Sequence, residues 1–192
     1  MRAARILIAI TAACAIAAGC TRWPAPVPRR TAYPRPAVLD TARRSLGPDT
    51  LAGIDLSVNR SATLSSAREG WLDIRYAQHG ATVHLTLTRA GGEALRRARA
   101  NRLQRLALNL GDNPGRRLEW ISPHGFDILE VYAPESAFPY QFLATDGESC
   151  MLSGALRFDD PTASARPDSM APLYDAISSD LHRSLVDLRL RP

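Results

Sequence analysis

The residue with the clearest chemistry in this sequence is Cys20, which directly follows the small residues 17–19 (Ala-Ala-Gly). Arg2, Arg5 and an apolar run of about a dozen residues precede it, which is the layout of a secretory signal peptide. The run is shorter than the roughly 20 residues that span a bilayer. Small side chains fit the groove of a signal peptidase, and a thiol accepts diacylglycerol as a thioether. We therefore predict a lipoprotein signal peptide over residues 1–19 and a covalent lipid on Cys20. An ordinary signal peptide with an incidental cysteine is the alternative.

The cysteine count predicts a mature chain without an internal disulfide. Cys14 would leave with the signal peptide and Cys20 would carry lipid, so Cys150 has no partner. A single cysteine could act as a nucleophile, but a small buried side chain is the interpretation that we favour. The globular part must therefore be held together by its core.

The other chemically reactive residues form no familiar catalytic or metal-binding motif. The sequence has no Gly-x-Ser-x-Gly motif, no glycine-rich phosphate loop and no cysteine–histidine spacing suited to zinc. We expect His84 at the surface or in a second layer of a strand, and His182 on a helix surface beside Asp180. The sequence therefore predicts no catalytic residue, no metal and no cofactor besides the lipid on Cys20, in a protein that is not an enzyme.

The charged residues argue against a nucleic-acid partner. All 24 basic residues are arginines, which together with abundant alanine, proline and glycine indicates a GC-rich genome. Loss of Arg2 and Arg5 with the signal peptide leaves 22 arginines against 19 acidic residues, a net charge of +3. Nucleic-acid-binding proteins cluster their basic residues with aromatic or groove-reading elements, and this pattern is not found in the sequence.

The elements that must position these residues begin after a linker. Residues 20–37 hold the lipidated cysteine and are rich in proline and arginine, which favours an extended, semi-rigid spacer. We predict one globular domain over residues 38–192, and its first part, up to Ser66, is expected to hold coil and short strands. Alternating apolar residues on both sides of a turn at Gly80 predict a β-hairpin over residues 70–89.

In the second half of the domain, the spacing of the apolar residues changes between the helical and the strand period. Leucines at helical spacing, with arginines on the remaining surface, predict an amphipathic helix over residues 91–110. Four strands should follow, and their expected ranges are 116–122, 126–133, 139–146 and 150–158. Asp146-Gly147-Glu148 forms the expected turn of the last hairpin. We predict a closing helix over residues 172–190, with Asp168 capping a start near Pro172. The sum is an α+β domain whose antiparallel sheet is flanked by helices.

Several segments carry motifs that recur together in one protein family. The stretch "WLDIRYAQHGATVHLTLT" is similar to a "W-x-NI-x-FP…G-x-IHLSY" motif, and "PVPRRTAYPRP" to "PKPRGYFRI". In the second half, "YQFLATD", "LSGALRF", "RPDSMAP" and "DLHRSL" match "QFFLTD", "L-x-GALYF", "PN-x-DSLAP" and "D-x-x-HLI". Departures occur at Asp73, where the motif has asparagine, and at Tyr76-Ala77, where it has Phe-Pro. In this order, the motifs resemble the gliding-motility lipoprotein GldD family.

The resemblance implies a function in the bacterial envelope. It implies a lipid-anchored accessory protein of the gliding-motility and type IX secretion machinery, which acts on other envelope proteins by protein–protein interaction rather than by catalysis. The residues just after Cys20 include no acid, and we therefore expect an outer-membrane anchor with the domain facing the periplasm. The order of elements resembles the α/β/α sandwich of MOG1/PsbP-like domains, which is an analogy of fold alone.

The family motifs mark ten candidate interaction residues. They are Trp71, His84, Gln141, Phe142, Asp146, Gly154, Asp168, Ser169, Pro172 and His182. Two alternatives stay open. One is a periplasmic module that binds lipid or a small ligand in a large apolar cavity. The other is an envelope hydrolase, which would need acids and histidines to converge, for example His84 or His182 near Asp168.

Overall fold

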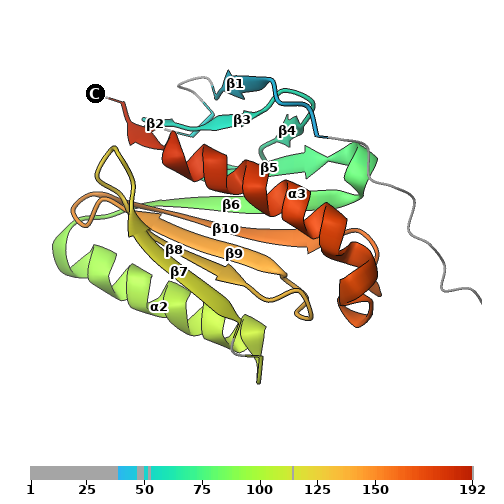
Figure 1. Ribbon diagram of the computed structural model, residues 1–192. Coiled ribbons are helices and arrows are strands. Elements are labelled where there is room, and N and C mark those ends of the chain that lie inside the picture. Colours follow the sequence, from blue (N-terminus) through green and yellow to red (C-terminus); the bar gives the residue numbers. More distant parts are fainter. Residues whose placement is uncertain (1–38, 47–49, 52, 114, 192) are drawn as a thin grey trace, which may run out of the picture. The chain divides into compact units, whose positions relative to one another are not determined.

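The computed structural model describes residues 39–46, 50–51, 53–113 and 115–191, all within one compact unit (Figure 1). The predicted signal peptide, Cys20 and the proline-rich linker lie outside the described residues. No helix in the described ranges is both long enough and apolar enough to cross a lipid bilayer.

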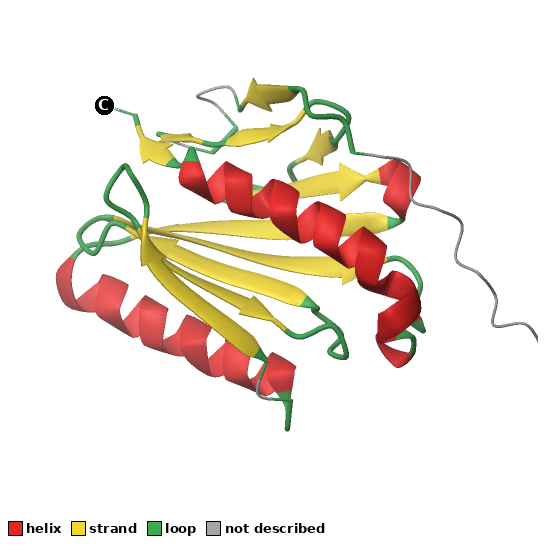
Figure 2. Cartoon of the chain, in the orientation of Figure 1, coloured by secondary structure: helices red, strands yellow, loops and turns green. Residues whose placement is uncertain are grey.

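A seven-stranded antiparallel sheet dominates this unit (Figure 2). Its strand order is β4-β5-β6-β10-β9-β8-β7, so that the β5–β6 hairpin lies beside β10, with β6 as its direct neighbour. The strands are β4 (Thr63–Ser65), β5 (Trp71–Tyr76), β6 (Ala81–Arg89), β7 (Arg116–Ile121), β8 (Asp127–Tyr132), β9 (Tyr140–Thr145) and β10 (Cys150–Phe158). A short 3-10 helix, η1 (Ala77–His79), connects β5 to β6. The predicted hairpin, the four later strands and the α+β class with an antiparallel sheet are confirmed.

Two helices cover opposite faces of the sheet. Successive side chains of a strand point to opposite faces, so both faces carry apolar side chains that a helix can bury. α3 (Pro167–Val186) packs its buried leucines and Ile177 into the main core, against the face that holds Leu72, Ile74 and Leu85. α2 (Gly92–Leu110) packs on the other face, where its leucines contact residues of β8, β9 and β10. Figure 1 shows α3 crossing the sheet.

The start predicted for the closing helix is wrong. α3 begins at Pro167 rather than near Pro172, and Asp168 lies inside its first turn. Arg166 is the N-cap residue and makes no side-chain capping hydrogen bond. Proline suits the first helical position because its missing N–H would have no partner there, and the chain uses the earlier of two available prolines. A second short 3-10 helix, η2 (Ala163–Ala165), precedes α3, and the helix ends at Val186.

The residues before the hairpin form short strands, as predicted. β1 (Arg43–Ser45) pairs with β3 (Ser57–Asn59), and β2 (Ile54–Asp55) pairs with β11 (Arg189–Leu190). β11 takes the place of the last residues of the predicted helix. The β2–β11 pair, a separate two-stranded sheet, thus joins residues 54–55 to residues 189–190 near the C-terminus.

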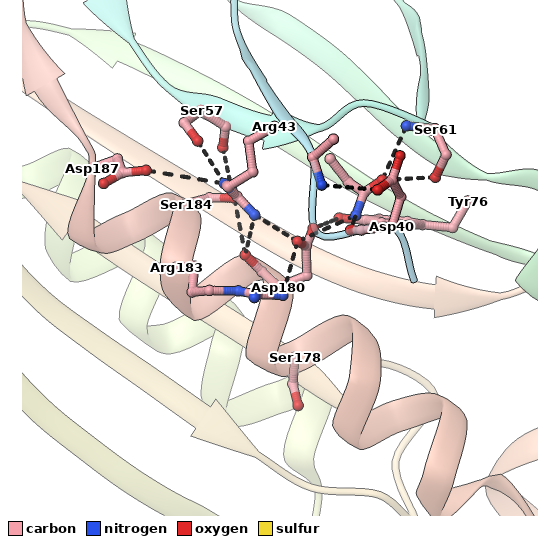
Figure 3. A network of polar contacts seen from close by, with 12 residues as sticks. Asp40, Arg43, Ser57, Ser61, Tyr76, Ser178, Asp180, Arg183, Ser184 and Asp187 are labelled. Atoms are coloured by element: carbon pink, nitrogen blue, oxygen red, sulfur yellow. Dashed lines mark hydrogen bonds and ion pairs between the residues drawn. The ribbon is translucent and has the colours of Figure 1, made fainter. Parts of the chain in front are cut away.

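A buried polar network ties this segment to α3 (Figure 3). Arg43 donates to Asp180 Oδ1 at 2.5 Å, to Ser184 Oγ at 2.6 Å and to the Ser57 carbonyl at 2.7 Å. Asp180 is fully buried and also accepts from the Tyr76 hydroxyl at 2.8 Å. Burial, together with the charge of Asp180, raises the pKa of Tyr76 far above its usual value, so that this hydroxyl stays a donor. Asp180 therefore lies in the interior, between α3 and the β1–β3 segment.

Candidate functional site

Five of the ten residues singled out from the sequence line one groove between α2 and the sheet. They are Trp71, His84, Gln141, Phe142 and Gly154. The C-terminal half of α2 supplies much of the opposite wall, through Arg102, Arg105, Leu106, Leu108 and Asn109. The groove has a volume of about 310 Å³ and is named the α2 groove below.

The α2 groove exists because α2 covers only part of its sheet face. Its buried leucines pack against β8, β9 and β10, for example on Val131, Leu143 and Met151. The β5–β6 part of the same face stays accessible: Trp71 is 41% exposed and His84 is half-buried. Strand register places Trp71 opposite Thr86 on this face, so that aromatic and hydroxyl side chains form the open floor.

Positive charge lines the helical wall of the α2 groove. Arg102 and Arg105 both line the groove and Arg102 is half-buried; burial, and then the charge of Arg105, lowers the pKa of Arg102. Arg68 stacks over Trp71, with its guanidinium carbon 3.8 Å from the ring centroid. On the sheet side, His84 Nδ1 lies 2.7 Å from Asp73 Oδ1, and both side chains are 43% exposed. The expected surface position of His84 is therefore confirmed.

Gln141 presents an unsatisfied donor in the wall of the α2 groove. Its Oε1 accepts a hydrogen bond from Asn109 Nδ2 at 2.8 Å, which links β9 to α2. Its Nε2 is buried and has no hydrogen-bond partner among the described residues. A buried donor without a partner costs free energy, so a ligand that supplies an acceptor here would recover it.

The other candidate residues lie elsewhere. Asp146 organises the β9–β10 turn by accepting from the backbone N–H groups of Glu148, Ser149 and Cys150. Asp168, Ser169 and Pro172 lie in the first two turns of α3 and are not part of the α2 groove wall. Cys150 is fully buried, as predicted, and burial followed by the nearby Asp146 raises the pKa of its thiol to about 11.

His182 lies at a partly exposed position on α3, as expected, and it also contacts a buried acid of the sheet. His182 is half-buried, and its Nδ1 lies 2.8 Å from Oε1 of Glu130, a fully buried residue of β8. Three neutral donors, Trp120 Nε1 and the hydroxyls of Tyr132 and Tyr140, also contact Glu130 at 2.6–2.8 Å. Asp168 pairs with neither histidine among the described residues, and the acids that meet them come from the sheet, Asp73 at His84 and Glu130 at His182.

Sequence reasoning missed Glu130, although a signal for it was present. In "DILEVY" apolar residues occupy both strand faces, which is typical of a strand that is covered on both sides. A glutamate in such a strand must be buried and hydrogen-bonded. Its partner was not predictable by spacing, since His182 lies 52 positions along the chain.

The described residues contain no group of three or more His, Cys, Asp or Glu side chains placed to hold a metal ion. No protein-family model matches the chain, and no curated protein matches it.

Proposed function

We propose that this protein is a lipid-anchored component of the bacterial envelope that works by binding a partner protein in the α2 groove, and not by catalysis. The observation that carries the proposal is the convergence of Trp71, His84 and Gln141 on that groove, whose lining also includes Phe142 and Gly154, although the Phe142 ring itself packs in the main core. These residues come from four strands, so their convergence is a property of the fold and not of local spacing.

The charge of the groove wall defines the kind of partner. Arg102 and Arg105 line the groove, and α2 carries five arginines against one acidic residue, Glu93. An acidic segment of a partner would neutralise this charge, and its carboxylates would pair bidentately with the guanidinium groups. Exposed apolar side chains, Trp71 at 41% and Leu108 at 74%, would pack on the apolar part of the segment. Aromatic and arginine side chains are the residues most enriched in protein–protein hot spots.

The cellular setting of the proposal rests on the sequence. The Cys20 motif supports a lipid anchor in the outer membrane with the domain in the periplasm, and the GldD-like motifs support work in gliding motility and type IX secretion. The MOG1/PsbP-like form of the sandwich is part of the same proposal. A sheet with one helix on each face is compatible with it.

Site-directed photo-crosslinking tests the proposal. A photo-reactive amino acid in place of Leu108, in the α2 groove, should capture an envelope protein through an acidic segment in intact cells. The matched control is the same amino acid in place of Ile121, which is 70% exposed and is not part of the groove wall. Capture of the same proteins from both positions, or of none from Leu108, would contradict the proposal.

Replacement of the lipid-bearing cysteine tests the anchor separately. Cys20→Ser should abolish the mass increase of the acyl chains on the mature N-terminal peptide and should move the protein out of the membrane fraction. Cys150→Ser is the control, because Cys150 is fully buried and outside the motif. An unmodified wild-type Cys20 peptide in mass spectrometry would remove the anchor from the proposal.

A further inference from the structure

The sheet face opposite the α2 groove carries a second cleft, which the proposed function does not use. This α3 cleft has a volume of about 600 Å³ and lies between α3 and the β7–β8 edge of the sheet. Its polar lining includes Arg116, Tyr132, Tyr174, Ser179, His182 and Arg183. Strand register explains the sheet contribution, since Arg116 and Tyr132 are directly opposite each other in the β7–β8 pair.

A buried carboxylate fixes the orientation of the imidazole in the α3 cleft. Glu130 is fully buried and holds His182 Nδ1 at 2.8 Å, while Trp120 packs against the same imidazole with ring centroids 5.0 Å apart. The other ring nitrogen, Nε2, lies on the edge away from Glu130 and has no partner among the described residues. Since the His182 side chain is 39% exposed, Nε2 is available to a ligand in the α3 cleft. A carboxylate behind a histidine is a common way to orient an imidazole toward a ligand.

Tyr174 supplies a second unused hydrogen-bonding group. It is 7% exposed, it lines the α3 cleft, and its hydroxyl has no hydrogen-bond partner among the described residues. Burial, followed by the effect of Tyr132, raises the pKa of Tyr174 well above its usual value, so that the hydroxyl keeps its proton and can donate. Buried hydroxyls are normally paired, so this one points to a missing acceptor.

The charges around the α3 cleft favour an anion. Arg116 makes no ion pair with a described residue, and its guanidinium lies 4.4 Å from the centroid of the Tyr132 ring. Arg183 makes a long hydrogen bond and ion pair with Asp180 Oδ1 at 3.5 Å, and its side chain is still 50% exposed toward solvent. Asp175 is the one acidic side chain in the described lining, against these two arginines.

We propose that the α3 cleft binds a phosphate group, held by Arg116 from the sheet and by His182 and Arg183 from α3. The ligand class is a phosphate monoester, either a soluble metabolite or a lipid headgroup. Two guanidinium groups, a tyrosine hydroxyl and, in its imidazolium form, His182 Nε2 offer more donors than the two oxygens of a carboxylate accept, whereas three terminal phosphate oxygens match them. Glu130 is a positioning residue, since it acts on the ligand only through His182.

Calorimetric titration with glycerol 3-phosphate tests the proposal on the full lipidated chain in phosphatidylcholine nanodiscs. We expect saturable binding at one site, which Arg116→Ala weakens about tenfold through loss of a charge-assisted contact. Arg117→Ala is the matched control, because the next residue of β7 points to the opposite sheet face, and it should change the affinity by less than about twofold. The imidazole NMR signals of His182 should shift with the ligand, while those of His84 should not.

A second set of nanodiscs, with phosphatidate added, separates the two ligand sources. If the site binds a lipid headgroup, phosphatidate alone should shift the His182 signals, and Arg116→Ala should abolish this shift. Phosphatidate should then also compete with glycerol 3-phosphate. A soluble ligand predicts no effect of phosphatidate. Absence of saturable binding and of any His182 shift in both disc types would overturn the proposal, and so would equal losses in the Arg116 and Arg117 variants. These results are independent of the α2 groove, which is on the other face of the sheet.

Discussion

At the scale of single residues, Asp146 shows how one carboxylate shapes a turn. Its Oδ1 accepts from three successive backbone N–H groups, and the Ser149 hydroxyl donates to its Oδ2. Partial burial raises the pKa of Asp146, but the hydrogen bonds from Ser149, Cys150 and Glu148 outweigh it and lower the pKa well below the usual value. The folded state therefore binds a proton at Asp146 less readily than the unfolded chain does.

Acid stability follows from this difference, with a definite sign. A lowered folded-state pKa contributes stability above the unfolded pKa of about 3.9, and the contribution is lost as the pH falls below it. In Asp146→Asn the side-chain carbonyl can still accept the backbone hydrogen bonds but does not titrate. The free energy of unfolding of the variant, from urea denaturation, should therefore fall less steeply than that of the wild type between about pH 4 and pH 2. Asp112→Asn, in an exposed turn, is the control and should keep the wild-type slope. If the free energy of unfolding of all three proteins depends on pH in the same way, the hydrogen bonds to Asp146 do not contribute to acid stability.

The sequence predicted the structural environment of some residues better than that of others. Asp146 could be placed in a turn because Asp-Gly between two strands is a local signal. Glu130 and His182 were not joined, because their contact depends on how α3 crosses the sheet. His84 was placed correctly because strand alternation alone decides its face.

At the scale of elements, the pairing of β9 with β10 depends on a glycine opposite a phenylalanine. Gly154 lies directly opposite Phe142, and a Cβ at position 154 would overlap the Phe142 ring and crowd Leu85. Because Phe142 is 3% exposed, its ring has little room to move. Gly154→Ala should therefore lower the free energy of unfolding by about 1–3 kcal/mol.

Urea denaturation measures this cost. Ala155→Ser, at the next residue and on the opposite sheet face, is the control and should stay within about 0.5 kcal/mol of the wild type. A Gly154→Ala protein as stable as the control would show that the aromatic ring does not need the glycine.

The attachment of β1 and β3 to α3 depends on a charge pair. Arg43→Met would remove the closer of the two cations that pair with the fully buried carboxylate of Asp180, since Arg183 stays 3.5 Å away, at a cost of about 3 kcal/mol. Arg44→Met is the neighbouring control, since Arg44 donates only to the Ala62 carbonyl, at 2.8 Å, and should cost about 1 kcal/mol. Thermal and urea unfolding of Arg43→Met, Asp180→Leu and the double variant form a cycle. The double variant should cost less than the sum of the two single ones. Additive costs would mean that the two residues do not depend on each other.

Periodicity predicted these elements but not their assembly. Period-two and period-3.6 patterns placed the hairpin, α2 and the late strands, because each pattern is set by neighbouring residues. The start of α3 was misplaced because two prolines offered equivalent first turns. The end of the same helix was misplaced because Arg189 of β11 pairs with Asp55 of β2, 134 positions earlier in the chain.

At the scale of the whole molecule, the sheet separates two polar sites. The α2 groove is open because the buried leucines of α2 pack on β8, β9 and β10 and leave Trp71 and His84 of β5–β6 accessible, and the α3 cleft lies against the β7–β8 edge of the other face. No sequence pattern shows which part of a sheet face a helix will cover, so neither site could be predicted as a site. The residues of the α2 groove were nevertheless singled out from motifs, and the fold brings five of them together.

A charge exchange across the α2 groove tests the central claim most directly. Arg105→Glu should reduce crosslinking of the partner to a photo-reactive residue at position 108 at least about tenfold, since like charges then face each other. An acid-to-arginine change in the crosslinked segment of the partner should restore it. Arg97→Glu, on an exposed part of α2 that is not part of the groove wall, should leave the crosslink intact. Loss with Arg105→Glu and recovery with the partner's reversed charge is the predicted result. An unchanged crosslink in Arg105→Glu, or equal loss in Arg97→Glu, would contradict binding in the α2 groove.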